Sequence, residues 1–159
     1  LCGWSASSAF GFVDDDCIGA GYGLQDTNPN STGLKGKIAA WGSTSVSDND
    51  LTIEARDLPR NAFGFALNAP DRGLLINPGG SSGNILLGGP VGRFQQAVAS
   101  SGPEGIITLD VDVTMIPRPS PQFVAIQPGE TWRFQFWHRD SAGGSATSNF
   151  TSAVEVTFD

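Results

Sequence analysis

Glycine and proline interrupt this sequence at short intervals and leave little room for a long helix. The 159 residues include 21 glycines and 10 prolines, and both residue types are unfavourable inside helices. Between these interruptions apolar and polar side chains alternate, which is the pattern of a strand with one buried face. The clearest case is residues 107–113, where Ile107, Leu109, Val111 and Val113 alternate with polar side chains.

Further short runs have strand-like composition and are bounded by turn-forming residues. They occupy residues 37–41, 51–56, 63–67, 74–76, 85–87, 93–98, 132–139 and 153–158. About nine short strands separated by turns predict an all-β fold, either an antiparallel β-sandwich or a jelly roll. A length of 159 residues is typical of a single domain. We expect residues 1–22 to form an N-terminal extension and residues 23–159 to form the sandwich module.

The last two runs supply the most apolar candidates for the core. Each presents three apolar side chains on one face of a strand. They are Trp132, Phe134 and Phe136 in the first run, and Val154, Val156 and Phe158 in the second. We therefore expect both sets to lie inside the sandwich.

Acidic residues outnumber basic ones, 16 to 9, which gives a formal net charge of −7. That excess argues against nucleic acid, whose phosphates require a clustered basic face, and against an anionic membrane surface. No apolar run approaches the roughly 20 residues of a membrane-spanning helix, so membrane insertion is not expected. The chain begins at Leu1 without Met, and we expect a mature or excised fragment of a secreted or cell-surface protein.

The two cysteines, Cys2 and Cys17, lie close together in the sequence. As a disulfide they would close a loop of roughly 15 residues, worth about 3 kcal/mol in the chain-entropy model. The alternative is two free thiols in a cytosolic protein. The extracellular character of the composition favours the disulfide. Two cysteines and one histidine do not make a zinc site without carboxylates, so structural zinc is not expected.

The sequence offers no recognisable catalytic machinery. Its single histidine, His138, shares a strand face with Trp132, Phe134 and Phe136, and a core histidine is favoured over a general base. No G-x-S-x-G elbow is present. Asp110 carries its carboxylate on the predicted solvent face, and adjacent acids on one strand do not oppose each other across a cleft as a glycosidase requires. We therefore do not expect an enzyme.

No cofactor is required by the sequence, and calcium is the one metal that its acidic clusters suggest. Hard cations take carboxylate and amide oxygens, and two loop-like clusters provide them without matching an EF-hand loop. These are Asp14, Asp15 and Asp16 in one cluster, and Asp48 and Asp50 in the other. A solvated acidic surface is the alternative.

A candidate ligand face lies opposite the predicted core face of residues 132–139. Arg133, Gln135, Trp137 and Arg139 alternate with the core aromatics. A tryptophan flanked by arginine and glutamine can form a sugar platform, because the apolar sugar face stacks on the ring while polar neighbours bond the hydroxyls. The alternative is that Trp137 covers a loop or meets a second subunit.

Three stretches carry a family resemblance: residues 28–33 (NPNSTG), residues 61–94 (NAFGFALNAPDRGLLINPGGSSGNILLGGPVGRF) and residues 128–158 (PGETWRFQFWHRDSAGGSATSNFTSAVEVTF). They resemble a module found near the C-termini of large secreted proteins of planctomycetes, myxobacteria and similar bacteria. The likeness covers nearly everything from Tyr22 onward. It implies an extracellular accessory domain of a bacterial protein, and it brings no assigned activity or ligand.

The sequence departs from that module at two positions. Members of the family usually carry one cysteine just after the tyrosine that matches Tyr22 and another in a stretch NLCLGG. This chain has Gly23 and Leu86 there. The two cysteines are missing together, as expected if they pair in relatives. We therefore expect Gly23 and Leu86 to be close in the fold. We expect Cys2 and Cys17 to form a disulfide that replaces the missing one.

Two functional hypotheses follow. The first is a structural or adhesive module of an extracellular assembly or filament, joined to copies of itself or to other extracellular proteins through the N-terminal extension. Its basis is the apolar run at residues 5–13, with Phe10 and Phe12, which could add to a neighbour's sheet edge. The alternative is that the extension packs along an edge of its own sheet, which would leave a monomer. The second is a carbohydrate-binding module that holds a polysaccharide on the face of Trp137.

Overall fold

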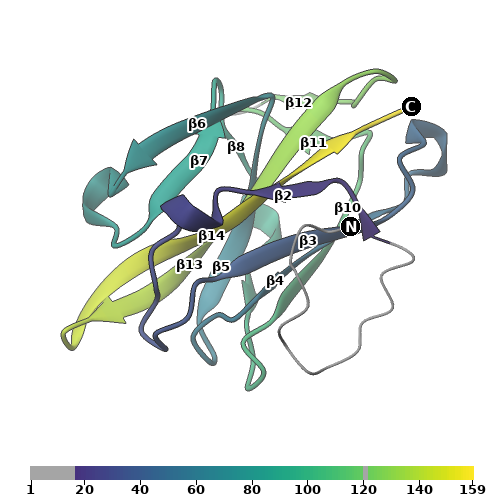
Figure 1. Cartoon of the computed structure of the whole chain (residues 1–159). Helices are drawn as coiled ribbons and strands as arrows, with labels where there is room; N and C mark the ends of the chain where they lie inside the picture. Colours follow the sequence, from purple (N-terminus) through teal and green to yellow (C-terminus); the bar gives the residue numbers. More distant parts are fainter. Residues whose placement is uncertain (1–16, 120–121) are drawn as a thin grey trace.

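A computed structural model of the chain describes residues 17–119 and 122–159 (Figure 1). These residues form fourteen short and long strand segments, and every named pair of strands is antiparallel. Helix occurs among them only as short 3-10 turns: η2 (Leu24–Asp26), η3 (Val46–Asp48), η4 (Pro78–Gly80) and η5 (Gln95–Ala97). The prediction of an all-β sandwich is confirmed, although there are more strand segments than the nine predicted.

The smaller sheet has four strands in the order β1-β3-β4-β10. They span Cys17–Ile18, Lys37–Gly42, Leu51–Arg56 and Ile107–Val111. In β4 the buried side chains are Leu51, Ile53 and Ala55, with half-buried polar residues between them. The predicted alternation is therefore confirmed here, because one face of the strand meets the second sheet and the other meets water.

The larger sheet has the order β2-β14-β13-β5-β8, and β9 also pairs with β5. Its strands are β2 (Ala20–Tyr22), β5 (Phe63–Ala69), β8 (Gly92–Arg93), β9 (Ala99–Ser100), β13 (Thr131–Ala142) and β14 (Ser145–Thr157). β13 and β14 form a long hairpin. Gly143 and Gly144 close it with φ angles of 56° and 83°, a conformation that glycine adopts without steric cost.

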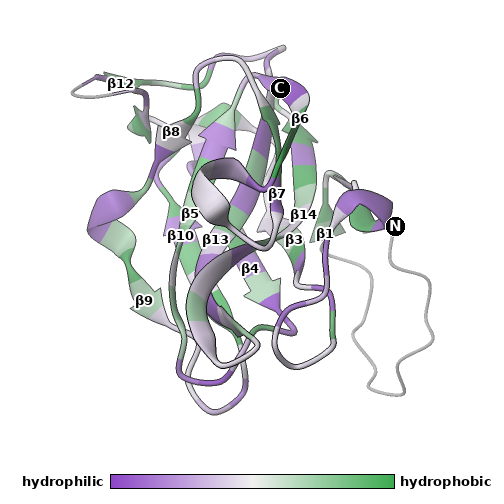
Figure 2. Cartoon of the chain, turned by 90° about the vertical axis from the view of Figure 1, so that its left-hand side faces the viewer, coloured by the Kyte–Doolittle hydropathy of each residue, from purple (hydrophilic) through white to green (hydrophobic). Residues whose placement is uncertain are grey.

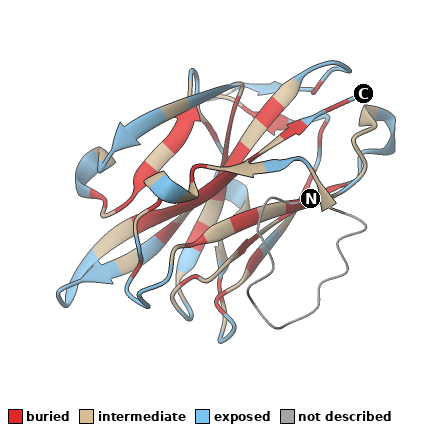
Figure 3. Ribbon diagram, viewed as in Figure 1, coloured by how far each residue is buried: buried red, intermediate tan, exposed pale blue. Residues whose placement is uncertain are grey.

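The main core lies between the two sheets (Figure 3). All six side chains predicted for it are buried, each no more than 5% exposed. They are Trp132, Phe134 and Phe136 of β13, Val154 and Val156 of β14, and Phe158, which follows β14. The predictions for both runs are confirmed.

A second apolar cluster lies on the other face of the larger sheet. The hairpin of β6 (Asp71–Ile76) and β7 (Asn84–Gly88) covers that face (Figure 1). Buried residues of the cluster come from β5, β7 and β14: Leu67, Ala69, Leu86, Leu87, Phe150 and Ala153. The fold is thus a sandwich with a third, partial layer.

Residues 17–22 belong to both sheets. β1 pairs with β3, and β2 pairs with β14. Gly19 connects them with a φ angle of 80°, and a β-carbon there would lie 2.9 Å from Cγ2 of Val156. The sandwich therefore begins before the boundary predicted at residue 23. The rest of the predicted extension, residues 1–16, lies outside the described residues.

A small pair of strands completes the fold at one end. β11 (Ile116–Pro117) pairs with β12 (Phe123–Val124). Asn68 of β5 donates its amide to the Pro117 carbonyl at 3.0 Å, and the Ile126 amide donates to the Val113 carbonyl at 2.8 Å. These bonds hold the β11–β12 pair next to β8. No helix in the described part of the chain combines the length and the apolar character that crossing a membrane requires.

Candidate functional site

The sheet face predicted to bind sugar is covered by the β6–β7 hairpin. Gln135 is fully buried, and Arg133 and Trp137 are half-buried. The Trp137 ring packs against Phe65 with ring centroids 5.0 Å apart. Only Arg139, beyond the covered region, is exposed. The prediction of an open Trp/Arg/Gln platform is therefore corrected, because the third layer occupies the space in which a sugar would stack.

Gln135 is a structural residue. A register shift between β13 and β14 places an extra residue in β14 next to Gln135, a β-bulge that breaks the regular ladder. The Gln135 amide nitrogen donates to the Thr151 carbonyl at 2.7 Å and to the Asn84 carbonyl at 3.0 Å. Its oxygen accepts from the Leu86 amide at 3.0 Å. The Gln135 side chain thus hydrogen-bonds a backbone group at the bulge and also links the β6–β7 hairpin to the larger sheet.

Arg133 is engaged in a network of charges beneath the same hairpin. Its Nε donates to Glu155 at 3.1 Å, and Arg72 of β6 makes two bonds to the same carboxylate at 2.5 and 2.9 Å. The hydrogen bonds from Arg72, with the nearby positive charges, hold the pKa of Glu155 below its ordinary value. Arg72 also lies over the Tyr22 ring at 4.3 Å, and burial raises the pKa of Tyr22 to about 12.

His138 lies at the end of the main core, fully buried as predicted for a core histidine. Its Nδ1 lies 3.0 Å from the Arg139 carbonyl, and its Nε2 has no hydrogen-bond partner among the described residues. Burial lowers the pKa of the imidazole, because a charged ring would lose its hydration. The ring is therefore held neutral and away from solvent.

The acidic clusters do not converge in the described part of the chain. Asp48 and Asp50 are exposed, and the Asp48 carboxylate accepts from the Ser43 hydroxyl at 2.6 Å. Within residues 17–119 and 122–159, no three His, Cys, Asp or Glu side chains are grouped to hold a metal ion. The other proposed calcium ligands, Asp14, Asp15 and Asp16, lie outside the described residues, as does Cys2, the predicted disulfide partner of Cys17.

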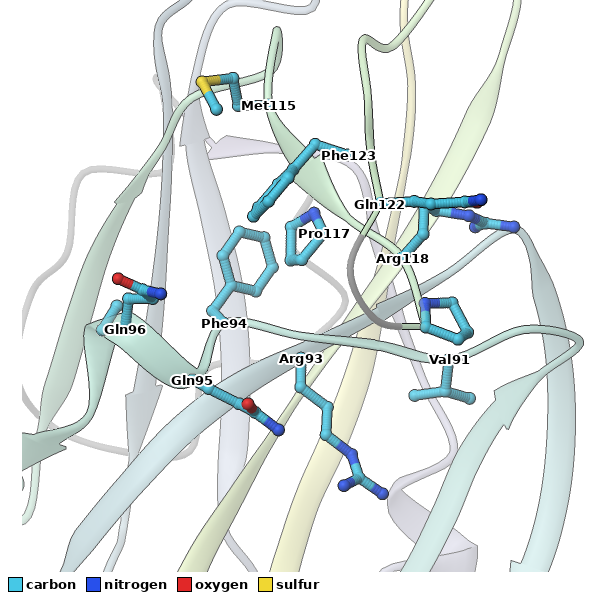
Figure 4. A pocket seen from close by; sticks show the side chains of 12 residues that line it. Val91, Arg93, Phe94, Gln95, Gln96, Met115, Pro117, Arg118, Gln122 and Phe123 are labelled. Carbon is cyan, nitrogen blue, oxygen red and sulfur yellow. The ribbon is translucent and has the colours of Figure 1, made fainter.

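A groove that the sequence patterns did not single out lies beside the last strand of the larger sheet. Residues of β8, η5, β11 and the turn before β12 surround a cavity of about 520 Å³ (Figure 4). We call it the β8–β12 groove. Its apolar side chains are Val91, Phe94, Ala97, Met115, Pro117, Pro119 and Phe123, and its polar ones are Arg93, Gln95, Gln96, Arg118 and Gln122.

The charge of the groove is opposite to that of the chain. Arg93 and Arg118 line it, and none of its lining residues is acidic. The ion pairs of the described residues use four of the other seven cations, Lys37, Arg56, Arg72 and Arg133. Arg118 lies over the Trp132 ring at 5.3 Å, and its buried Nη1 has no hydrogen-bond partner in the described part of the chain. The groove can therefore bind an anionic group beside an apolar one.

Comparison with known proteins supplies no further guide to this site. No family model, curated protein or solved structure matches the chain significantly. The resemblance to a bacterial secreted module accordingly stays an expectation from the sequence.

Proposed function

We propose that this protein is a non-catalytic structural or adhesive module of the extracellular space, and that it assembles through its N-terminal segment. The observation that carries the proposal is the placement of the sheet edges. Residues 17–22 lie along the β1 and β2 edges, so the segment before Cys17 is attached there. The largest group of exposed apolar side chains lies near the opposite edge of the larger sheet.

That group accounts for five of the nine exposed large apolar side chains in the described residues. β12, β8 and β9 lie along one side of the molecule in Figure 2, and the five residues belong to these strands or to their neighbours. They are Phe63, Val98, Met115, Phe123 and Val124. Exposed large apolar side chains gathered on one side of a protein are typical of an interaction site.

The N-terminal segment has the composition of a partner for such a surface. Residues 9–13 read AFGFV, and burial of each phenylalanine would contribute about 1.5–3 kcal/mol. Addition of an extended segment to a neighbour's edge also satisfies backbone groups that an edge leaves unpaired. Because the donor segment is attached at the edge opposite the acceptor, such a contact is heterologous and would join copies head to tail.

Electron microscopy and sedimentation of the full chain test this proposal. We expect filaments, sheets or a concentration-dependent series of oligomers. A protein that remains monomeric at all accessible concentrations, in the presence and absence of calcium, would contradict the proposal.

Carbohydrate binding is the second candidate, and the β8–β12 groove favours it over the covered sheet face. Phe94 and Phe123 could stack on a sugar, while Arg93 and Gln122 could bond its hydroxyl or carboxylate groups. Retention of the monomer on an insoluble polysaccharide, with loss of retention in Phe123→Ala, would support this function instead.

A further inference from the structure

We infer that the β8–β12 groove is the acceptor for residues 9–16 of a second copy of the chain. The inference rests on the proposed function and names the contact by which copies would join. It combines three observations: the apolar lining of the groove, its two arginines without ion-pair partners, and the distance between the groove and the residue where the N-terminal segment is attached.

The apolar part of the groove suits the two phenylalanines of the segment. Figure 4 shows the side chains of Phe94, Pro117, Phe123 and Met115 grouped together on the groove. Met115 and Phe123 are each 53% exposed, so both have surface left to bury. Aromatic rings pack favourably against each other and against a thioether. Residues 9–13 (AFGFV) would bring two rings to this place.

The cationic part of the groove suits the acids that follow. The segment continues from Val13 into Asp14, Asp15 and Asp16, so an apolar stretch leads directly into three carboxylates. Arg93 is exposed, and neither it nor Arg118 has an ion-pair partner in the described part of the chain. Complementary charge next to complementary apolar surface fixes the direction and register of a bound segment.

The acids at the end of the segment are attached too close to Cys17 for their backbone to reach the groove of their own molecule. Asp16 precedes Cys17, which pairs with Trp41 in the smaller sheet, close to β2. In the larger sheet β14, β13 and β5 lie between β2 and β8, and four strand spacings amount to about 19 Å. Asp14 extends at most about 10 Å from Cys17. The backbone of the acids therefore comes next to Arg93 on a second copy and not on its own.

The exposed β6 strand is a less suitable acceptor. Leu74, Leu75 and Ile76 are exposed there, so this strand also offers apolar surface. The β6–β7 register shifts between Arg72 and Leu75, and such an irregularity protects an edge from adding another strand. Arg72 is already bound to Glu155, which leaves no free cation nearby for the three acids.

A charge-exchange experiment with the full chain tests the contact. Arg93→Glu reverses charge in the groove, and the triple change Asp14→Arg, Asp15→Arg and Asp16→Arg reverses it in the segment. We expect each variant alone to lower the association constant by about tenfold, and an equimolar mixture to recover part of the loss because the reversed charges again complement one another. Arg60→Glu, on the loop between β4 and β5, is the matched control and should assemble normally.

The apolar part of the contact has its own pair of variants. Phe123→Asp and Leu75→Asp each place an acid at a side chain that is about half exposed, 53% and 56%, so neither should unfold the protein. We expect Phe123→Asp to lower association more than about tenfold, as loss of a central interface residue does. Leu75→Asp should leave association unchanged.

The outcomes separate this inference from the proposed function. Assembly that survives both Arg93→Glu and Phe123→Asp, or that is lost in Leu75→Asp, overturns the groove as acceptor while leaving assembly itself established. A full chain that stays monomeric overturns both. Normal assembly of Arg93→Glu with loss of binding to soluble polygalacturonate would identify an acidic polysaccharide as the occupant and overturn the inference.

Discussion

Gly23 and Leu86 pack directly against each other in the second apolar cluster. A β-carbon on Gly23 would lie 3.3 Å from Cγ of Leu86, and the Tyr22 hydroxyl donates to the Leu86 carbonyl at 3.0 Å. The resemblance to a bacterial secreted module implies cysteines at these two positions in relatives. The prediction that they are neighbours is confirmed, and it was made from the paired absence of those cysteines.

The double variant Gly23→Cys and Leu86→Cys is therefore expected to form a disulfide. Closing the loop between β2 and β7 would stabilise the fold by about 4 kcal/mol in the chain-entropy account. The φ angle of 76° at Gly23 would offset about 1–2 kcal/mol of that gain, since a side chain is strained there. Urea denaturation with and without reductant measures the difference. Two thiols that remain open to alkylation in the native state would contradict the proposed proximity.

Replacing Gln135 by leucine should destabilise the protein although it exchanges a polar residue for an apolar one in the interior. The change leaves the Leu86 amide and the Asn84 and Thr151 carbonyls without their side-chain partner, and we expect a loss of about 2–4 kcal/mol. Chemical denaturation measures the loss. Arg139→Leu, on the exposed continuation of β13, is the control and should stay within about 0.5 kcal/mol of the parent. An unchanged stability for Gln135→Leu would show that the β6–β7 hairpin is held by its apolar contacts alone.

The two tryptophans of β13 should differ in their contribution to stability. Trp132 is 5% exposed in the main core, and Trp132→Ala is expected to cost about 3–5 kcal/mol. Trp137 is half-buried on the other face, so Trp137→Ala should cost less. Denaturation of both variants gives the comparison. A loss below about 1 kcal/mol for Trp132→Ala would mean that the faces of the strand are inverted.

His138 should make the stability depend on pH just below its ordinary pKa of 6.5. Burial lowers the pKa in the folded state, so between that lowered value and 6.5 the unfolded chain binds a proton that the folded chain does not. The free energy of unfolding should therefore fall as the pH is lowered through this window, by up to about 1.4 kcal/mol per pH unit. Asp140, the acid near the ring, also has a lowered pKa, and its effect appears only at more acidic pH. Thermal denaturation of the parent and of His138→Gln, from pH 5 to 8, isolates the histidine. An identical dependence of stability on pH in both proteins would contradict this prediction.

Much of the fold follows from local patterns, because the alternation of apolar and polar side chains indicates which face of a strand is buried. The pattern predicts the correct faces for residues 51–55 and 107–111, and for Trp132, Phe134 and Phe136. The beginning of β14 was missed, since residues 145–149 are polar and small. Asn149 is nevertheless buried there, because its amide bonds to the Pro29 carbonyl at 3.1 Å, a contact between distant parts of the chain.

The candidate site was less predictable for the same reason. Alternation placed Arg133, Gln135 and Trp137 on one face, but it carries no information about a hairpin that folds over that face from residues 71–88. The β8–β12 groove is lined by residues from two parts of the chain, one within residues 92–97 (GRFQQA) and the other at residues 117–119 and 122–123. Neither part shows a regular alternation of apolar and polar residues. The only signal was two arginines set among aromatic and proline residues in an acidic chain, and nothing in the sequence places the two stretches together.

Sedimentation velocity of the full chain beside a variant lacking residues 1–13 tests the central claim most directly. The deletion removes Phe10 and Phe12 and keeps the described strands, beginning with β1 at Cys17. The account predicts that the full chain sediments as assemblies, and that the truncated chain sediments as a monomer with an unchanged melting temperature. Assemblies of the same size from both proteins, or a monomer from both, would contradict it.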